Sequence, residues 1–274
     1  MVFSLRRASA AFLLIVALAA CEPRSEPEPG NVAASAEPKQ PAIKLPDVIP
    51  TPAVALDRAA LLAAVAQAAS AQAAGLDDRQ RQADLAGRRF TLKIRFGCGG
   101  PTDADTALGW SYDEAEQRLG IRAVPDIDLA AAGVEPSSEG PVEAVEGFWI
   151  SQPWLLTDAC PARPAAPDGQ AAAAAGPPTV GIAHYFTTED SRVQRRAKRS
   201  YEIVRRADPA ILPPEGGFNL VLEGRLRPWP EAGVIRCSGA GGAARPVCIV
   251  SAEFDRVAFE NPATGMTVAQ WGAG

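Results

Sequence analysis

The chain has 274 residues, and its 27 lysines and arginines against 32 aspartates and glutamates give a formal net charge of −5. An acidic balance of this kind excludes a general nucleic-acid binder, which needs a basic surface. Hydrophobic residues make up 47% of the chain, which is enough for a sizeable core. The 24 glycines and 25 prolines indicate many turns and linkers, because these two residues together average roughly 12% of a protein.

Residues 1–20 are typical of a secretory signal peptide. Arg6 and Arg7 precede an apolar run from Ala10 to Ala20, which is shorter than the roughly 20 residues that a transmembrane helix needs. Small residues then lead directly into Cys21. An ordinary secretory peptide would share the charge and the apolar run, whereas small residues immediately before a cysteine favour a lipidation site.

The order Leu18-Ala19-Ala20-Cys21 resembles the lipobox of bacterial lipoproteins, a resemblance that covers only the first 21 residues. It implies cleavage before Cys21 and acyl chains on the Cys21 sulfur and amine, which would tie the protein to a lipid bilayer. One acyl chain holds only marginally, whereas two or more give stable anchoring. The residue after Cys21 is Glu22 and not an aspartate. For this reason the resemblance implies the outer membrane, with the domain facing the periplasm.

Residues 21–53 are expected to be a lipid-anchored, disordered tether. Eight prolines lie among residues 22–53, together with Glu, Ala and Ser. Such a composition cannot bury enough apolar surface to fold, and proline favours an extended chain. The tether would hold the following domain away from the lipid surface.

An alanine-rich helical segment is predicted over residues 54–87. Asp57 is a candidate N-cap, and Leu61, Leu62 and Val65 form one short apolar stripe. Gly75 is expected to end this helix, and a second helix is expected to start at Asp77 or Asp78.

From residue 88 to residue 274 the periodicity changes to two, which is typical of half-buried strands. The clearest case is Phe90, Leu92, Ile94 and Phe96, which alternate with polar residues. The sequence predicts an all-β domain, a β-sandwich or partly open barrel of about 8–10 strands. Residues 161–178, almost entirely Ala, Pro and Gly, are expected to be a disordered insertion.

Four cysteines remain if Cys21 is lipidated: Cys98, Cys160, Cys237 and Cys248. An even number in an oxidising compartment predicts two disulfides, for which three connectivities exist. The simplest connectivity is local, with Cys98 bonded to Cys160 and Cys237 bonded to Cys248. The second of these bonds would close a β-hairpin.

A basic run from Ser191 to Arg206 is the best candidate for a binding site. It carries seven positive charges against Glu202 alone, from Arg192, Arg195, Arg196, Lys198, Arg199, Arg205 and Arg206. Guanidinium groups bind phosphate in two places, so the run suits an anionic glycan, a lipid headgroup or an acidic envelope protein. The alternative interpretation is a solvated face without a ligand.

Other chemistry-bearing residues do not form a recognisable site. His184, the only histidine, is in register with Val180, Ile182 and Phe186, so a satisfied and partly buried histidine is expected. A calcium loop needs further features besides the carboxylates of Asp103, Asp105 and Glu114, and the sequence does not supply them. The aromatic corner Phe148-Trp149-Ile150 with Trp154 is expected to pack in the core, with stacking on sugar rings or a partner as the alternative.

The sequence therefore predicts no catalytic residue, no metal site and no cofactor, and it favours a non-enzymatic binding or structural module of the envelope. The alternative is a periplasmic hydrolase that acts on cell-wall glycan through a carboxylate pair. The candidate carboxylates for that pair are Glu135, Glu139, Glu143 and Glu146.

Overall fold

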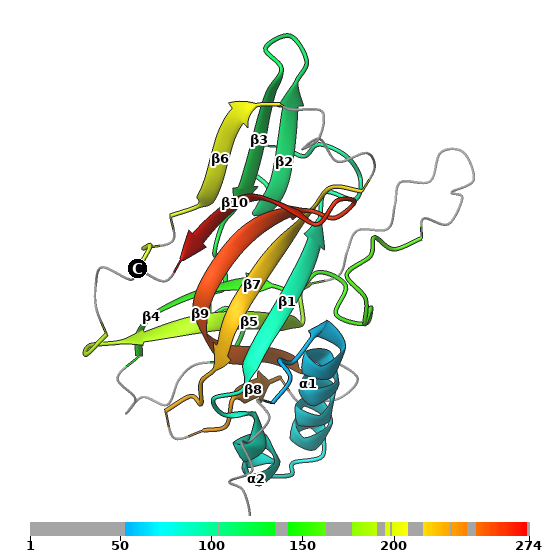
Figure 1. Cartoon of the computed structure of the whole chain (residues 1–274). Helices are drawn as coiled ribbons and strands as arrows, with labels where there is room; N and C mark the ends of the chain where they lie inside the picture. The colour runs from blue at the N-terminus through cyan, green and yellow to red at the C-terminus, as the bar shows by residue number, and fades with distance from the viewer. Residues whose placement is uncertain are drawn as a thin grey trace, which may run out of the picture. The chain divides into compact units, whose positions relative to one another are not determined.

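The computed structural model describes residues 53–103, 105–134, 142–162, 177–190, 195–197, 199–207, 216–230, 232–239 and 245–272. The signal peptide with Cys21, the tether up to residue 52 and nearly all of the insertion lie outside these residues. The described part is an all-β domain of ten strands in two sheets, preceded by short helices (Figure 1). The predicted fold class is therefore confirmed.

The helical segment begins where the sequence predicts. The Asp57 carboxylate accepts a hydrogen bond from the backbone N–H of Ala60 at 2.8 Å and so caps the first helix. Gly75, with a φ of +67°, lies just beyond the end of that helix. The elements are α1 (Arg58–Ala73), α2 (Arg79–Gln82) and a 3-10 turn (Ala83–Leu85). No helix among the described residues combines the length and apolarity needed to cross a bilayer.

The larger sheet has seven strands in the order β1-β7-β9-β5-β4, with β8 and β10 also paired to β9, and the smaller has the order β2-β3-β6. The strands are β1 (Arg89–Phe96), β2 (Leu108–Asp113), β3 (Arg118–Ala123), β4 (Val142–Trp149), β5 (Val180–Thr187), β6 (Tyr201–Arg206), β7 (Phe218–Leu226), β8 (Ile235–Ser238), β9 (Val247–Asn261) and β10 (Met266–Gly272).

Strand β9 holds the larger sheet together, and it is long and strongly curved (Figure 1). Its residue Ser251 donates its N–H to the carbonyl of Val234 at 2.8 Å and accepts from the N–H of Arg227 at 3.1 Å. Because both groups of one residue point to the same edge of a strand, β7 and β8 follow one another along that edge. Strand β5 pairs in parallel with the start of β9, and β10 pairs antiparallel with its end.

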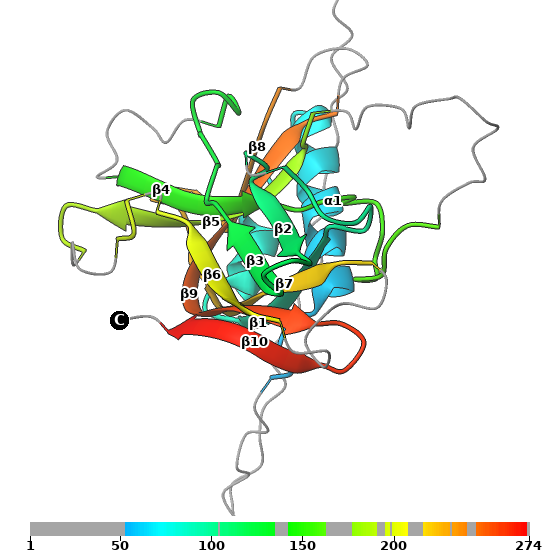
Figure 2. The same ribbon diagram turned by 90° about the horizontal axis from the view of Figure 1, so that it is seen from above.

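One core joins the helix and both sheets. Leu92 and Ile94 of β1 are fully buried, as the alternation predicts, and Leu61 of α1 lies in the same cluster. From the small sheet, Leu119 and Ile121 of β3 enter this cluster too. Both sheets therefore bury side chains in a shared core, as in a sandwich, and α1 packs against β1, β8 and β9 of the larger sheet (Figure 2).

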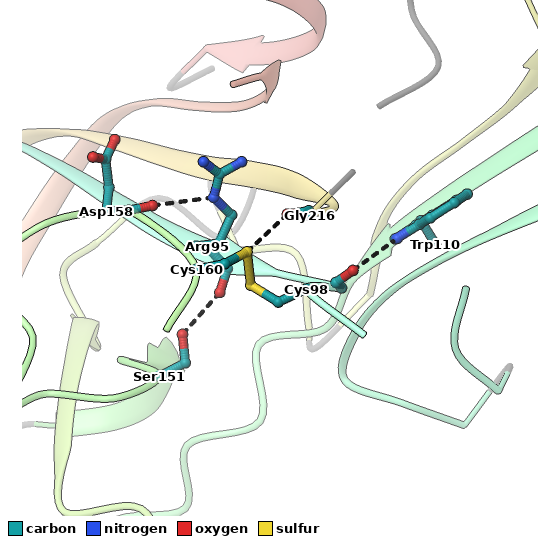
Figure 3. Close-up of a disulfide and its surroundings, with 8 residues drawn as sticks. Arg95, Cys98, Trp110, Ser151, Asp158, Cys160 and Gly216 are labelled. Carbon is teal, nitrogen blue, oxygen red and sulfur yellow. Dashed lines mark hydrogen bonds between the residues drawn. A yellow bond between two sulfur atoms is a disulfide. The ribbon is translucent and has the colours of Figure 1, made fainter. Parts of the chain in front are cut away.

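The two disulfides have the local connectivity that the sequence favours, Cys98 to Cys160 and Cys237 to Cys248. Figure 3 shows the first, which ties the end of β1 to the segment that follows β4. Around it, the Ser151 hydroxyl donates to the Arg95 carbonyl at 2.9 Å, and the Arg95 Nε donates to the Asp158 carbonyl at 3.1 Å. This corner is held by a covalent bond and by hydrogen bonds together.

The expectation that the aromatic corner packs in the core is wrong for one of its residues. Phe148 and Ile150 are buried, but the Trp154 side chain is 65% exposed. The chain leaves the sheet after Ile150 in a turn that includes Gln152 at a φ of +46°. Beyond that turn the pleat no longer determines which side chains face the core.

Candidate functional site

A cavity of about 190 Å³ lies where β4, β5, β9 and β10 meet the segment that leads into β6. We call it the arginine–aromatic pocket, because arginines and aromatic rings make up most of its lining. Its residues are Pro125, Glu146, Phe148, His184, Phe186, Arg195, Arg196, Arg199, Tyr201, Glu253, Phe254, Arg256, Val257, Trp271 and Gly272.

Strand pairing explains why these residues meet. Glu146 of β4 lies directly opposite His184 of β5, so their side chains point to the same face. Phe148 and Phe186 are two residues further along their strands and therefore share that face. The curved strand β9 adds Phe254 to it.

The rings form a connected wall. The His184 ring stacks on Phe186, with centroids 4.2 Å apart and an interplanar angle of 22°, and meets the Phe254 ring edge-on at 6.1 Å. The Tyr201 ring lies 5.9 Å from the Phe148 ring and 5.2 Å from the Trp271 ring. Such offset and edge-to-face contacts are favourable for aromatic pairs and fix the wall in place.

His184 is uncharged at neutral pH. Burial and, next, the positive charge of Arg227 lower the pKa of His184 to about 4, against a weaker opposite effect of Asp190. The ring is half-buried, as the sequence predicts, but it lines a cavity. The alternation placed His184 on the correct face without showing that this face borders a pocket.

Two arginines of the basic run are fixed against the aromatic wall. The Arg195 guanidinium lies 5.5 Å from the Phe186 centroid and is held by Glu143 at 2.6 Å and the Thr187 carbonyl at 2.9 Å. The Arg196 guanidinium lies 4.2 Å from the Tyr201 centroid and donates to the Ser200 carbonyl at 2.9 Å. A guanidinium over an aromatic face is stabilised by the ring and keeps a fixed plane.

Both of these arginines leave a donor without an acceptor. In the part of the chain that the structure describes, the Nε atoms of Arg195 and Arg196 are buried and have no hydrogen-bond partner. A buried unpaired donor is destabilising by about 1–3 kcal/mol, and more when it carries charge. Because these Nε atoms are closed off from solvent, a ligand in the pocket would be held by the rest of each guanidinium group and by Arg199.

The basic run is divided between the pocket and the sheet. Arg199 joins Arg195 and Arg196 in the lining, whereas Arg205 and Arg206 belong to β6 and bond to the Val268 carbonyl and the Gln117 side chain. Arg192 and Lys198 lie outside the described residues. The sequence did not identify Arg256, which is held by Glu223 at 3.1 Å.

Two carboxylates line the pocket as well. Glu146 is only 7% exposed, and its Oε1 accepts a hydrogen bond from the Ala197 N–H at 2.7 Å. Glu253 of β9 also lines the pocket and was not singled out by the sequence, although a charge inside an apolar strand is a usable signal. Glu143 is paired with Arg195, while Glu135 and Glu139 lie outside the described residues.

Among the described residues, no group of three His, Cys, Asp or Glu side chains is placed to hold a metal ion. The chain matches no family model, no curated protein and no solved structure. The function therefore has to be inferred from the chemistry of the arginine–aromatic pocket together with the N-terminal sequence.

Proposed function

We propose that this chain is a lipid-anchored protein of the bacterial cell envelope whose β-domain binds an anionic group and does not transform it. The carrying observation is that Arg196 and Arg199 line one pocket beside aromatic rings and form no ion pair within the described residues. A phosphate or carboxylate offers acceptor oxygens in the plane of a guanidinium, which a neutral ligand does less well. The anionic group belongs to an envelope glycan, lipid or partner protein.

The state of His184 supports binding over catalysis. A general base works best with a pKa near the working pH. With its pKa lowered to about 4, His184 binds protons too weakly for that role near neutrality. Its stacked ring serves as an apolar wall for the ligand.

The envelope location is supported by the sequence and by the disulfides. The lipobox-like Leu18–Cys21 precedes a proline-rich stretch that could serve as a tether. The two disulfides fit an oxidising compartment such as the periplasm. Lipidation at Cys21 and the outer-membrane location belong to the same proposal.

Calorimetric titration of the purified lipidated chain, in non-ionic detergent, with inorganic phosphate tests the binding proposal. The double variant R196Q/R199Q should weaken phosphate binding at least about a hundredfold, since it removes two charged contacts of about 1.4 kcal/mol or more each. The charge-matched control is R89Q/R118Q, which removes two exposed arginines outside the pocket lining. Absence of saturable binding to the wild type, or equal loss in the control, would overturn the proposal.

One observation keeps the hydrolase alternative open. Glu146 and Glu253 line the same pocket, and glycoside hydrolysis uses two carboxylates. Incubating the wild type, E146Q and E253Q with purified cell-wall glycan and measuring new reducing ends separates the two functions. Turnover by the wild type that either variant abolishes would establish the enzyme.

A further inference from the structure

We propose that the ligand of the arginine–aromatic pocket is a small zwitterionic group, which carries an ammonium as well as an anion. This inference rests on the proposed function, because the anionic half is the group that the arginines bind. It adds the second charge and the size of the ligand.

The charge arrangement of the pocket favours a zwitterion over a simple anion. Arg195 is neutralised by Glu143 and Arg256 by Glu223. Of the charged lining residues that the structure describes, two positive ones, Arg196 and Arg199, and two negative ones, Glu146 and Glu253, then remain. None of these four side chains forms an ion pair within the described residues. A bare anion would be attracted by the two arginines and repelled by the two glutamates.

The carboxylate half of the pocket has the properties of an ammonium site. Glu146 is nearly buried, and within the described residues its carboxylate accepts a hydrogen bond from the neutral Ala197 N–H and forms no ion pair. A buried carboxylate without a cation is destabilising, so an incoming ammonium gains from the contact. The Trp271 ring in the same lining also attracts cations.

The two halves lie close together in space. Arg196 stacks on Tyr201, and the next residue, Ala197, donates its N–H to Glu146 of β4. The Glu146 carboxylate is thus bonded to the backbone position that follows the anion-binding Arg196. A ligand that spans them needs only a few bonds between its charges, as in an amino acid or in phosphoethanolamine.

The size of the cavity agrees with a small group. Its volume of about 190 Å³ is below the roughly 300–1,000 Å³ of pockets that enclose a drug-sized ligand. It is suited to a headgroup or a free small molecule. The same zwitterion could come from either source.

The test compares four probes on the lipidated chain in non-ionic detergent by calorimetry: inorganic phosphate, ethanolamine, O-phosphoethanolamine and dihexanoyl phosphatidylethanolamine. O-phosphoethanolamine should bind at least about tenfold more tightly than phosphate or ethanolamine, because it forms one more ion pair and a tenfold gain in affinity corresponds to about 1.4 kcal/mol. Tighter binding of the short-chain phospholipid supports a lipid headgroup, and tighter binding of O-phosphoethanolamine supports a free zwitterion.

Substitutions distinguish this inference from the proposed function. E146Q, whose amide oxygen can still accept from the Ala197 N–H, should abolish the preference for O-phosphoethanolamine over phosphate, while the exposed control E114Q should keep it. R196Q should weaken the binding of both probes. If the wild type binds phosphate and O-phosphoethanolamine equally, or E146Q keeps the preference, the zwitterion is wrong while Arg196-dependent phosphate binding still stands. If phosphate binding does not depend on Arg196, the proposed function fails as well.

Discussion

Nη2 of Arg58 donates a hydrogen bond to the carbonyl oxygen of Ser151 at 2.8 Å, which joins the start of α1 to the chain just after β4. The same guanidinium donates to three further carbonyls, those of Lys93, Gln152 and Leu155. Arg58 is only 7% exposed, and burial lowers its pKa. One side chain therefore satisfies the backbone of two separate segments around the Cys98–Cys160 disulfide.

Replacing Arg58 with methionine should lower the free energy of unfolding by about 3 kcal/mol or more, because the buried carbonyls lose a charged donor. The measurement is the urea midpoint of the lipidated chain. The control is Arg79→Met. Arg79 forms an ion pair with Asp77, and their side chains are 66% and 59% exposed, so this substitution should leave the midpoint unchanged. Equal midpoints for Arg58→Met and the wild type would show that Arg58 does not hold this corner.

The two disulfides should differ in their effect on stability. Cys98 and Cys160 are 62 residues apart and Cys237 and Cys248 only 11, so the first closes the longer loop. In the loop-entropy model, replacing both cysteines by serine lowers the free energy of unfolding by about 4 kcal/mol at the first pair and about 3 kcal/mol at the second. Urea unfolding of the two double variants checks this order. The reverse order would mean that native contacts, not loop length, dominate.

Gly217 should resist substitution more than Gly265, although both have a positive φ, +71° and +69°. A Cβ at Gly217 would meet the backbone of Phe96 and Gly97, whereas a Cβ at Gly265 meets nothing within 4 Å. Gly265→Ala should therefore lower stability by only about 1 kcal/mol, and Gly217→Ala by clearly more. Thermal melts of the two variants compare them, and equal shifts would contradict the steric argument.

The sequence predicted elements whose pattern is local. Apolar and polar residues alternate in β1 because one face of the strand lies on the core. Asp57 caps α1 by bonding to the backbone only three residues further along the chain. The pocket is different, because Glu146, His184 and Glu253 meet only through pairing between distant strands. Periodicity assigned His184 to a face but carried no information about what that face meets. The positive charge of the basic run was visible, but its division between pocket and sheet depends on where β6 begins.

Stability should fall between pH 6.5 and pH 4 because of His184. An unfolded chain binds a proton at His184 near pH 6.5, whereas the folded chain does so only near its lowered pKa of about 4. Across this window the unfolded state takes up a proton that the folded state does not, so acidification lowers the free energy of unfolding by at most about 3 kcal/mol. Above pH 6.5 this effect is absent.

The measurement is the urea midpoint of the wild type and of His184→Gln at a series of pH values. The variant should have a flatter profile between pH 6.5 and pH 4, whatever its absolute stability. Protonation of Asp190 changes stability only at more acidic pH, because the hydrogen bond from the Thr187 N–H holds the pKa of the Asp190 carboxyl below its ordinary value. Parallel profiles for the two proteins would show that His184 protonates equally well in both states.

The proposed anchor makes a prediction that does not depend on the pocket. Each buried methylene of an acyl chain contributes about 0.8 kcal/mol, so two or more chains on Cys21 hold the protein to a bilayer, and their loss releases it. Cells grown with labelled palmitate should label the wild type, while Cys21→Ser should take up no label and move out of the membrane fraction. Cys237→Ser/Cys248→Ser is the control, since it removes two sulfurs and leaves Cys21 in place. A Cys21→Ser protein that stays in the membrane fraction, or a wild type without label, would mean that something other than acylation holds the chain there.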